Sequence, residues 1–378
     1  MELPRLDPGL PYLADVAPSV LAAMGVAGFE PRIEIAHDVA GACVLLIDGL
    51  GAQLLDDHAA DAPVLAALAR RTLQVGFPST TAAGLAAVGT GCRSGEHGMV
   101  GMAFRLPDVG VINALRWRPQ PWGADLRERA VPESVQPRPT VFERARAGGV
   151  TVSVVSAAQF DGSGLTRAVL RGGRFIGVHA LGDLAATVSA AVAGGGFCYG
   201  YHADLDLVGH LHGPGSPAWR MQLRQVDTLV ESIVERLPAG GLLAVVADHG
   251  MVRIDEAAAI DLDASSPLQD GVAAVAGEVR ARHVYVRDGA LGDVLAGWRA
   301  VLGDRAWVCT GDEAIEAGWF GERVDDAVRP RIGDVVVAAR GASGVLRRTA
   351  EPIESAMVGQ HGSVTEAEQR IPLLLAQR

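Results

Sequence analysis

Five short apolar runs, rich in β-branched residues, recur along this chain, and helix-like stretches separate several of them. The runs have the length of strands and lack polar alternation, which is typical of strands buried on both faces. They lie at residues 42–47, 151–155, 242–247, 283–286 and 334–338, and the helix-like stretches include residues 63–70 and 221–237. This alternation predicts βαβ units. We therefore expect an α/β fold with a mostly parallel central sheet and helices on both faces.

Two segments do not follow this alternation. Residues 103–138 are rich in proline, arginine and tryptophan, and residues 255–331 mix acidic helical stretches with strands. No repeat of fixed period and no long low-complexity linker divides the 378 residues. We expect one catalytic domain over residues 1–378, with small cap or edge insertions near 103–138 and 255–331.

Charge and hydropathy exclude several classes of partner. The formal net charge of −11 is unfavourable for polymeric nucleic acid, which clustered basic side chains bind. No apolar run approaches the roughly 20 residues that cross a bilayer, so we expect no membrane span. The first residues, MELPRLDPGLPYLADVAP, lack the basic and apolar regions of a secretory signal. We expect a cytoplasmic location; the sequence does not indicate an oligomeric state.

The absence of certain residues and motifs excludes further kinds of catalytic site. The chain contains no lysine, which excludes a Walker-type phosphate loop and a lysine Schiff base. The sequence contains no GxSxG motif, which argues against a serine hydrolase of the α/β-hydrolase type. The cysteines are dispersed, form no CxxC pair and are predicted to be reduced core residues: Cys43, Cys92, Cys198 and Cys309.

Acidic side chains follow two of the apolar runs directly. Asp48 ends the run in CVLLIDGLG, and Asp248 with His249 ends the run in LLAVVADHGM. Residues just past the carboxyl ends of strands lie at the edge where α/β proteins bind ligands. An Asp-Gly turn is the alternative for Asp48, whereas an adjacent Asp-His pair favours a metal site.

Two further segments carry side chains that bind metals. In YHADLDLVGHLHGPGS, Asp206 and His210 are four residues apart, so one helical turn would place both on the same face. His361 lies between small residues in GQHGSVTE. Alternatives remain, because the first segment could be a solvated loop and a lone histidine is often a surface residue. Rival ligands in the first segment are His202, Asp204 and His212.

A threonine hydroxyl completes the set. In FPSTTAAGLAAVGTG, Ser79, Thr80 or Thr81 precedes a run of small residues that is typical of a helix. Any of the three hydroxyls could cap that helix. Alternatively, one of them is a nucleophile placed where the unpaired amides of the helix start receive a phosphate.

Taken together, carboxylates, imidazoles and a hydroxyl predict a two-metal centre. Nitrogen and oxygen ligands without thiolates suit catalytic zinc, although manganese or iron could occupy the same positions. Two metal ions about 4 Å apart stabilise the attacking and leaving oxygens of an in-line displacement at phosphorus. We therefore expect two zinc ions and a small phosphorus-containing substrate.

Six blocks of the sequence resemble the motifs of the type I phosphodiesterase/nucleotide pyrophosphatase family, in the alkaline phosphatase superfamily. They occur in the order VLLIDGLG, FPSTT, TGCRSGEHGM, DLVGHLHGP, ADHGM and GQHGS, and they reach from Asp48 in the first block to Ser363 in the last. Each block is short, but the ordered set is specific.

The resemblance implies a role for each candidate residue. It implies that Thr81 is the nucleophile, that a phosphothreonine intermediate forms, and that Ser79 and Thr80 keep the capping role. His97, in the third block, would be structural. One zinc ion would be held by Asp48, Thr81, Asp248 and His249, and the other by Asp206, His210 and His361.

Several substrates and activities remain open at this point. Position 84, three residues past Thr81, is glycine and offers no side chain to a phosphate oxygen. The zinc ions, the Ala82 amide, Arg105 or Arg116 would then meet the transition-state charge. We favour hydrolysis of phosphoric diesters or pyrophosphates. The alternatives are a phosphomonoesterase, a phosphonoacetate-type hydrolase of the carbon–phosphorus bond, and an inactive metal-stabilised binding protein.

Overall fold

The computed structural model describes residues 2–35 and 38–378. A seven-stranded sheet forms its centre, in the order β2-β18-β9-β1-β8-β6-β7. Its strands are β1 (Gly41–Ile47), β2 (Ala69–Gln74), β6 (Val152–Ala157), β7 (Arg174–Val178), β8 (Phe197–His202), β9 (Gly241–Val246) and β18 (Arg370–Gln377). All residues of β1, β8 and β9 are buried, which explains the continuous apolar sequences of β1 and β9.

Most strands of this sheet run parallel. β1 pairs in parallel with β8 and β9, and β6 pairs in parallel with β7 and β8. Only β18 is antiparallel to its neighbours, β2 and β9. The predicted mostly parallel sheet is therefore confirmed.

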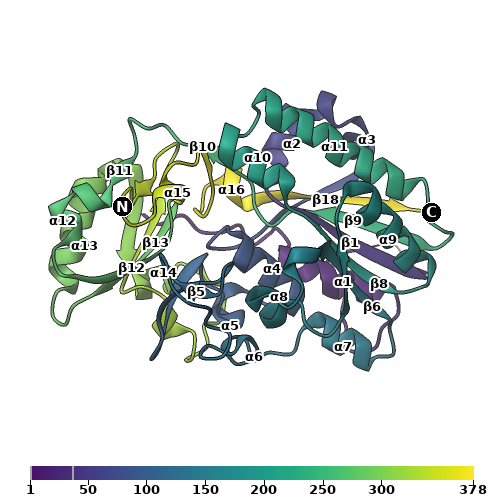
Figure 1. The fold of residues 1–378 in the computed structure, drawn as a ribbon, viewed down its shortest axis with the longest axis horizontal. Helices are drawn as coiled ribbons and strands as arrows, with labels where there is room; N and C mark the ends of the chain where they lie inside the picture. Colours follow the sequence, from purple (N-terminus) through teal and green to yellow (C-terminus); the bar gives the residue numbers. More distant parts are fainter. Residues whose placement is uncertain (1, 36–37) are drawn as a thin grey trace.

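Helices cover both faces of the central sheet (Figure 1). On one face lie α2 (Ala52–Asp57), α3 (Pro63–Ala67), α9 (Leu181–Ala193) and α11 (Pro217–Val234). The other face carries α1 (Val16–Ala23), α4 (Thr81–Thr90), α7 (Val141–Ala147) and α8 (Gly164–Val169). The helix predicted over 63–70 ends at Ala67, because Leu68 is extended and β2 begins at Ala69.

A second sheet lies beside the first and is antiparallel. Its order is β12-β13-β15-β14, and α12 (Ser266–Gln269) and α13 (Leu291–Leu302) pack against it. The strands are β12 (Val272–Glu278), β13 (Ala281–Val286), β14 (Ala306–Thr310) and β15 (Val335–Ala339). The apolar runs at 283–286 and 334–338 thus form strands, but in this sheet, where Trp298 is fully buried.

Short elements connect these layers. The segment 103–138 forms the three-stranded sheet β3 (Ala103–Leu106), β4 (Gly110–Asn113) and β5 (Arg118–Pro119), followed by α6 (Pro132–Val135). Two small pairs are β10 (Val252–Arg253) with β17 (Gly359–Gln360), and β11 (Ile260–Asp261) with β16 (Val345–Leu346). The remaining helices are α5 (Ser94–His97), α10 (Asp204–His212), α14 (Gly311–Glu316), α15 (Pro352–Ser355) and α16 (Glu366–Gln369).

Two expectations from composition can be compared with the structure. All four cysteines are free thiols, and three of them are buried. Within residues 2–35 and 38–378, no helix combines the length and the apolar character needed to cross a bilayer.

Candidate metal centre

The candidate site is built at the carboxyl ends of three adjacent strands. β1 lies between β9 and β8, so the residues that follow these strands meet at one edge of the sheet. Asp48 follows β1, Asp248 and His249 follow β9, and α10 begins two residues after β8. The strand order therefore brings together motifs that lie far apart in the sequence.

Helix α10 carries two of the predicted residues on one face. Asp206 Oδ2 lies 3.2 Å from His210 Nε2, as expected for residues four apart in a helix. The predicted rivals lie elsewhere: His202 Nε2 is 3.3 Å from Gln222 Nε2, and Asp204 and His212 are exposed.

A close contact between glycines brings His361 to this helix. A Cβ atom on Gly359 of β17 would lie 2.3 Å from the carbonyl oxygen of Gly209 in α10, so only glycine permits this approach. Consequently, the Nε2 atoms of His361 and His210 are 3.3 Å apart. The His361 ring also stacks on His249, with 3.5 Å between ring centroids.

Thr81 is the first residue of α4 and lies at the same cluster. Its Oγ1 is 3.3 Å from His249 Nε2. The same His249 nitrogen lies 3.3 Å from Asp48 Oδ1 and 3.6 Å from Asp248 Oδ2. Through these contacts, the structure brings all seven residues predicted for the site into one connected group.

The three imidazoles present the same nitrogen to the centre. Each Nδ1 atom lies at hydrogen-bonding distance from a backbone carbonyl oxygen. These distances are 2.7 Å from His210 to Gly359, 3.1 Å from His249 to Gly250, and 2.9 Å from His361 to Ser79. A proton on Nδ1 leaves the Nε2 lone pair free, which is the usual arrangement around a metal-binding histidine.

The carboxylates leave oxygens without donors at the same place. Three buried oxygens have no hydrogen-bond partner within the described chain: Asp48 Oδ1, Asp206 Oδ1 and Asp248 Oδ2. The second oxygen of Asp48 accepts a hydrogen bond from Tyr201, and that of Asp248 accepts one from the Gly49 amide at 3.2 Å. Buried carboxylate oxygens of this kind fit a bound cation.

The pKa shifts of the clustered side chains also favour bound cations. Burial raises the pKa of Asp48 well above its usual range, and the Asp248 and Asp206 carboxylates raise it further. Burial also raises the pKa of Asp248, and burial together with His249 lowers the pKa of His361 well below its usual range. Cations would relieve the carboxylate repulsion and would bind the neutral imidazoles.

Two groups of ligand atoms lie close enough to hold an ion. Atoms of Asp48, Asp248 and His249 lie within 4.8 Å of one another, and so do atoms of Asp206, His249 and His361. The sequence placed His249 with the first group only, whereas the structure sets it between the two. His210 borders the second group through Asp206 and His361.

The start of α4 differs from the sequence expectation that Ser79 and Thr80 cap this helix. Thr80 occupies the N-cap position, but its hydroxyl makes no capping bond and donates to Glu278 Oε2 at 2.7 Å. The Ser79 hydroxyl donates to the Ser363 carbonyl at 2.7 Å. Within the described chain, the amides of residues 81–83 have no hydrogen-bond partner. They are therefore free for an anion.

Two contributors were not found from the sequence. Tyr201, within β8, orients Asp48, and Glu278, at the end of β12, binds Thr80. Burial raises the pKa of Glu278 to about 7. Tyr201 begins the quoted segment YHADLDLVGHLHGPGS but is not one of the metal-binding residue types considered there, and Glu278 lies outside all the quoted motifs. His97 is buried and its Nδ1 accepts the Met99 amide at 3.1 Å, which agrees with a structural role.

The arginines considered for the transition state have partners outside the cluster. Arg116 pairs with Glu354 at 3.2 Å and lies over the ring of Trp122, while Arg105 lies over the ring of Tyr285. The first-turn amides of α4 are thus the better-placed donors.

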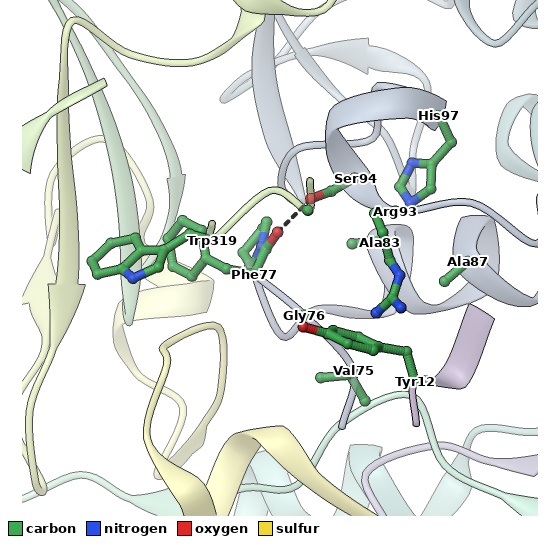
Figure 2. Close-up of a pocket in the computed structure, with 12 residues that line it drawn as sticks. Tyr12, Val75, Gly76, Phe77, Ala83, Ala87, Arg93, Ser94, His97 and Trp319 are labelled. Carbon is green, nitrogen blue, oxygen red and sulfur yellow. Dashed lines mark hydrogen bonds between the residues drawn. The ribbon is translucent and has the colours of Figure 1, made fainter. Parts of the chain in front are cut away.

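A small hollow beside α4 is distinct from this centre (Figure 2). Ala83 and Ala87 of α4 line it together with Tyr12, Phe77 and Arg93. Nearby, Ser94 donates a hydrogen bond to the Phe77 carbonyl at 2.6 Å. None of the seven predicted site residues lines this hollow.

Comparison with known proteins identifies one family over most of the chain. Residues 42–364 match the model of the family described as type I phosphodiesterase / nucleotide pyrophosphatase. A segment of 47 residues is 45% identical to the human catalytic subunit of GPI ethanolamine phosphate transferase 3. That segment covers 12% of this chain and only 4% of the relative's length.

Solved structures share the fold over nearly the whole chain. Murine ectonucleotide pyrophosphatase/phosphodiesterase 5 superposes with a TM-score of 0.67 at 16% identity, covering 89% of this chain and 88% of that one. Phosphonoacetate hydrolase from Sinorhizobium meliloti 1021, in complex with phosphonoformate, gives 0.65 at 19% identity and covers 90% of both chains.

Proposed function

Because the chain belongs to the type I phosphodiesterase/nucleotide pyrophosphatase family, we propose that it is a zinc-dependent hydrolase of phosphoric diesters or pyrophosphates, with Thr81 as its nucleophile. The contact that carries this proposal joins Thr81 Oγ1 to His249 Nε2 at 3.3 Å, beside the buried carboxylates of Asp48 and Asp248. A hydroxyl placed in such a cluster is suited to attack phosphorus.

The donor set fits two zinc ions. Asp48, Thr81, Asp248 and His249 would hold one ion, and Asp206, His210 and His361 the other. Zinc in such a site acts as a Lewis acid that eases deprotonation of a hydroxyl and neutralises charge on phosphoryl oxygens. The unpartnered carboxylate oxygens and the free Nε2 atoms support this assignment.

The proposed reaction consists of two displacements at phosphorus, both at Thr81 Oγ1. Thr81 Oγ1 loses its proton to solvent and attacks phosphorus, the bond to the leaving oxygen breaks, and that oxygen takes a proton from water. A water molecule then attacks the phosphothreonine, the bond between phosphorus and Thr81 Oγ1 breaks, and Thr81 regains a proton. The free amides at the start of α4 stabilise the negative charge in both transition states.

The substrate is proposed to be small. Murine ectonucleotide pyrophosphatase/phosphodiesterase 5 has been solved as an inactive threonine-to-alanine variant with AMP, and the bacterial relative with phosphonoformate or phosphonoacetate. The net charge of −11 is unfavourable for polymeric nucleic acid. We also propose that residues 1–378 act as one catalytic domain, which limited proteolysis tests. We further propose that the protein is located in the cytoplasm, which cell fractionation tests.

The nucleophile is tested with two substrates and two variants. Bis-p-nitrophenyl phosphate and p-nitrophenyl phosphate are hydrolysed by wild type, Thr81→Ala and Thr81→Ser. We expect the diester to be the better substrate, Thr81→Ala to lose activity and Thr81→Ser to retain part of it, because serine keeps the hydroxyl. Wild-type rates from Thr81→Ala on both compounds would exclude Thr81 from the mechanism.

The metal is tested on the purified protein by elemental analysis. We expect two zinc ions per chain, loss of activity on chelation, and recovery on adding zinc. Recovery with manganese or iron alone would assign a different metal. A protein that holds zinc but hydrolyses no ester, anhydride or phosphonate would be the inactive binding protein.

A phosphonate hydrolase is the second candidate, supported by the superposition on phosphonoacetate hydrolase. In that reaction Thr81 attacks phosphorus, the carbon–phosphorus bond breaks, and the carbon takes a proton from water to leave as acetate. Release of acetate from phosphonoacetate, lost in Thr81→Ala, would favour this activity over diester hydrolysis. Preference for p-nitrophenyl phosphate over the diester would instead indicate a phosphomonoesterase.

A further inference from the structure

Glu278 is a buried carboxylic acid that the proposed reaction does not use. It ends β12 in the second sheet, is 6% exposed, and reaches the chain segment that precedes Thr81. Its Oε2 accepts hydrogen bonds from Thr80 Oγ1 at 2.7 Å and from the Met102 amide at 3.3 Å. Its Oε1 has no partner in the part of the chain that the structure describes. A buried carboxyl oxygen without a hydrogen-bond partner is energetically unfavourable, so this side chain requires a structural or functional explanation.

Its surroundings hold the carboxyl group in one place. A Cβ atom on Gly362 would lie 3.0 Å from Glu278 Cγ and 3.2 Å from Oε1, so this glycine makes room for the side chain. Gly362 directly follows His361, and Thr80 directly precedes Thr81. Glu278 therefore contacts two of the chain segments that bring side chains to the candidate metal centre, the one at Thr81 and the one at His361.

The bond to Glu278 determines where the Thr80 hydroxyl points. Thr80 has φ −136° and ψ 150°, the extended conformation of an ordinary N-cap residue. Threonine in that position normally turns its oxygen to the amide two or three residues later, which here is Ala82 or Ala83. The hydroxyl instead donates to Glu278, and no capping bond forms.

We propose that Glu278 is a positioning residue that holds the Thr80 hydroxyl away from the first turn of α4, so that the amides beside Thr81 stay free for a phosphate oxygen of the substrate. This inference rests on the proposed function. Without Glu278, the Thr80 hydroxyl turns to cap α4 and competes with the substrate for the same amides. An N-cap bond of ordinary strength would then lower kcat/KM about 5- to 10-fold.

Three variants test the proposal on bis-p-nitrophenyl phosphate. Glu278→Met has similar length but cannot accept the hydroxyl bond, and we expect it to lower kcat/KM about 5- to 10-fold. Glu278→Gln still offers an oxygen to Thr80 and should stay within about 2-fold of wild type. Glu278→Met/Thr80→Val has no hydroxyl to compete, so it should recover most of the loss. A purely structural role for Glu278 predicts no recovery.

Folding and metal loading are followed by thermal melting and zinc content. Glu351→Gln is the matched control, because Glu351 is also buried in this region but pairs with Arg282 rather than with the segment at Thr80. We expect it to lower the melting temperature without changing kcat/KM of the folded protein. If Glu278→Met does not fold, Thr80→Val alone still tests the proposal, since it should lose less than about 3-fold.

Three results would each overturn the proposal. The first is wild-type activity of folded, zinc-loaded Glu278→Met. The second is a double variant no more active than Glu278→Met, and the third is a Thr80→Val protein impaired as strongly as Glu278→Met is expected to be. Thr81→Ala separates this failure from that of the proposed function: if it is inactive while Glu278→Met is unaffected, only the role of Glu278 is refuted.

Discussion

Gly84 of α4 lies directly against Asp248: a Cβ atom at position 84 would be 2.4 Å from the Asp248 Cβ and 3.1 Å from its Cα. Glycine at this position lets the helix that begins with Thr81 approach the end of β9. The missing side chain thus has a packing reason, because any larger residue would push Thr81 and Asp248 apart.

We therefore expect Gly84→Ala to damage the centre. Overpacking of this kind costs about 1–3 kcal/mol and would displace α4, so zinc content and diester hydrolysis should both fall. Gly182→Ala is the control, because a Cβ atom on Gly182, in α9, would meet no other atom within 4 Å. Elemental analysis measures the zinc content of both variants, and turnover measures their diester hydrolysis. Full zinc content and activity in Gly84→Ala would contradict the packing argument.

The hydroxyl of Tyr201 supports Asp48, and we expect its removal to weaken metal binding. Tyr201 donates to Asp48 Oδ2, and loss of such an outer partner typically lowers metal affinity about 10- to 100-fold. Tyr201→Phe should therefore lose zinc at lower chelator concentrations than wild type. Tyr199→Phe on the same strand is the control, since the buried Tyr199 hydroxyl has no hydrogen-bond partner in the described chain. Equal zinc affinity in the two variants would refute the role of Tyr201.

The parts of the site that the sequence predicts are those encoded locally. Asp48 and Asp248 each follow a continuously apolar run, and such runs become central parallel strands whose carboxyl ends meet. Asp206 and His210 are neighbours because of helical spacing alone. The α/β class and the convergence of these segments could therefore be predicted before any coordinates.

What the sequence does not reveal depends on contacts between distant segments. Glu278 and Thr80 are 198 residues apart, and neither sequence context indicates that they bond. The run at 283–286 has the composition of a parallel strand, yet it pairs antiparallel with β12 and β15. Strand order and buried polar pairs arise from tertiary packing, which local patterns do not record.

The buried His283 should make stability depend on pH. Its Nε2 lies 2.7 Å from the Val100 carbonyl oxygen and its Nδ1 accepts the Gly333 amide at 3.1 Å, so the ring is neutral. Burial lowers its pKa from 6.5 to about 4. The unfolded chain therefore takes up the proton first, and the stabilisation present above pH 6.5 is lost as pH falls towards 4.

For this histidine we expect a loss of about 2 kcal/mol in the free energy of unfolding between about pH 7.5 and pH 5. His283→Gln keeps a hydrogen-bonding group but does not titrate, so its stability should fall less over the same interval. Urea denaturation of both proteins at the two pH values measures the difference. An identical change in wild type and His283→Gln would show that His283 does not contribute.

Breaking the buried ion pair between Arg280 and Glu368 should destabilise the protein more than breaking the exposed pair between Arg329 and Asp312. Both side chains are fully buried, with Arg280 Nη2 2.6 Å from Glu368 Oε2, and Glu368 also accepts the Ser363 amide at 3.0 Å. Arg280→Met leaves a buried carboxylate without its counter-charge, so we expect a loss of about 3–5 kcal/mol in urea denaturation. Arg329→Met breaks the exposed pair with Asp312 and should cost at most about 1 kcal/mol. Equal losses in the free energy of unfolding of the two variants would contradict this prediction, because they would show that burial does not determine how much each ion pair contributes to stability.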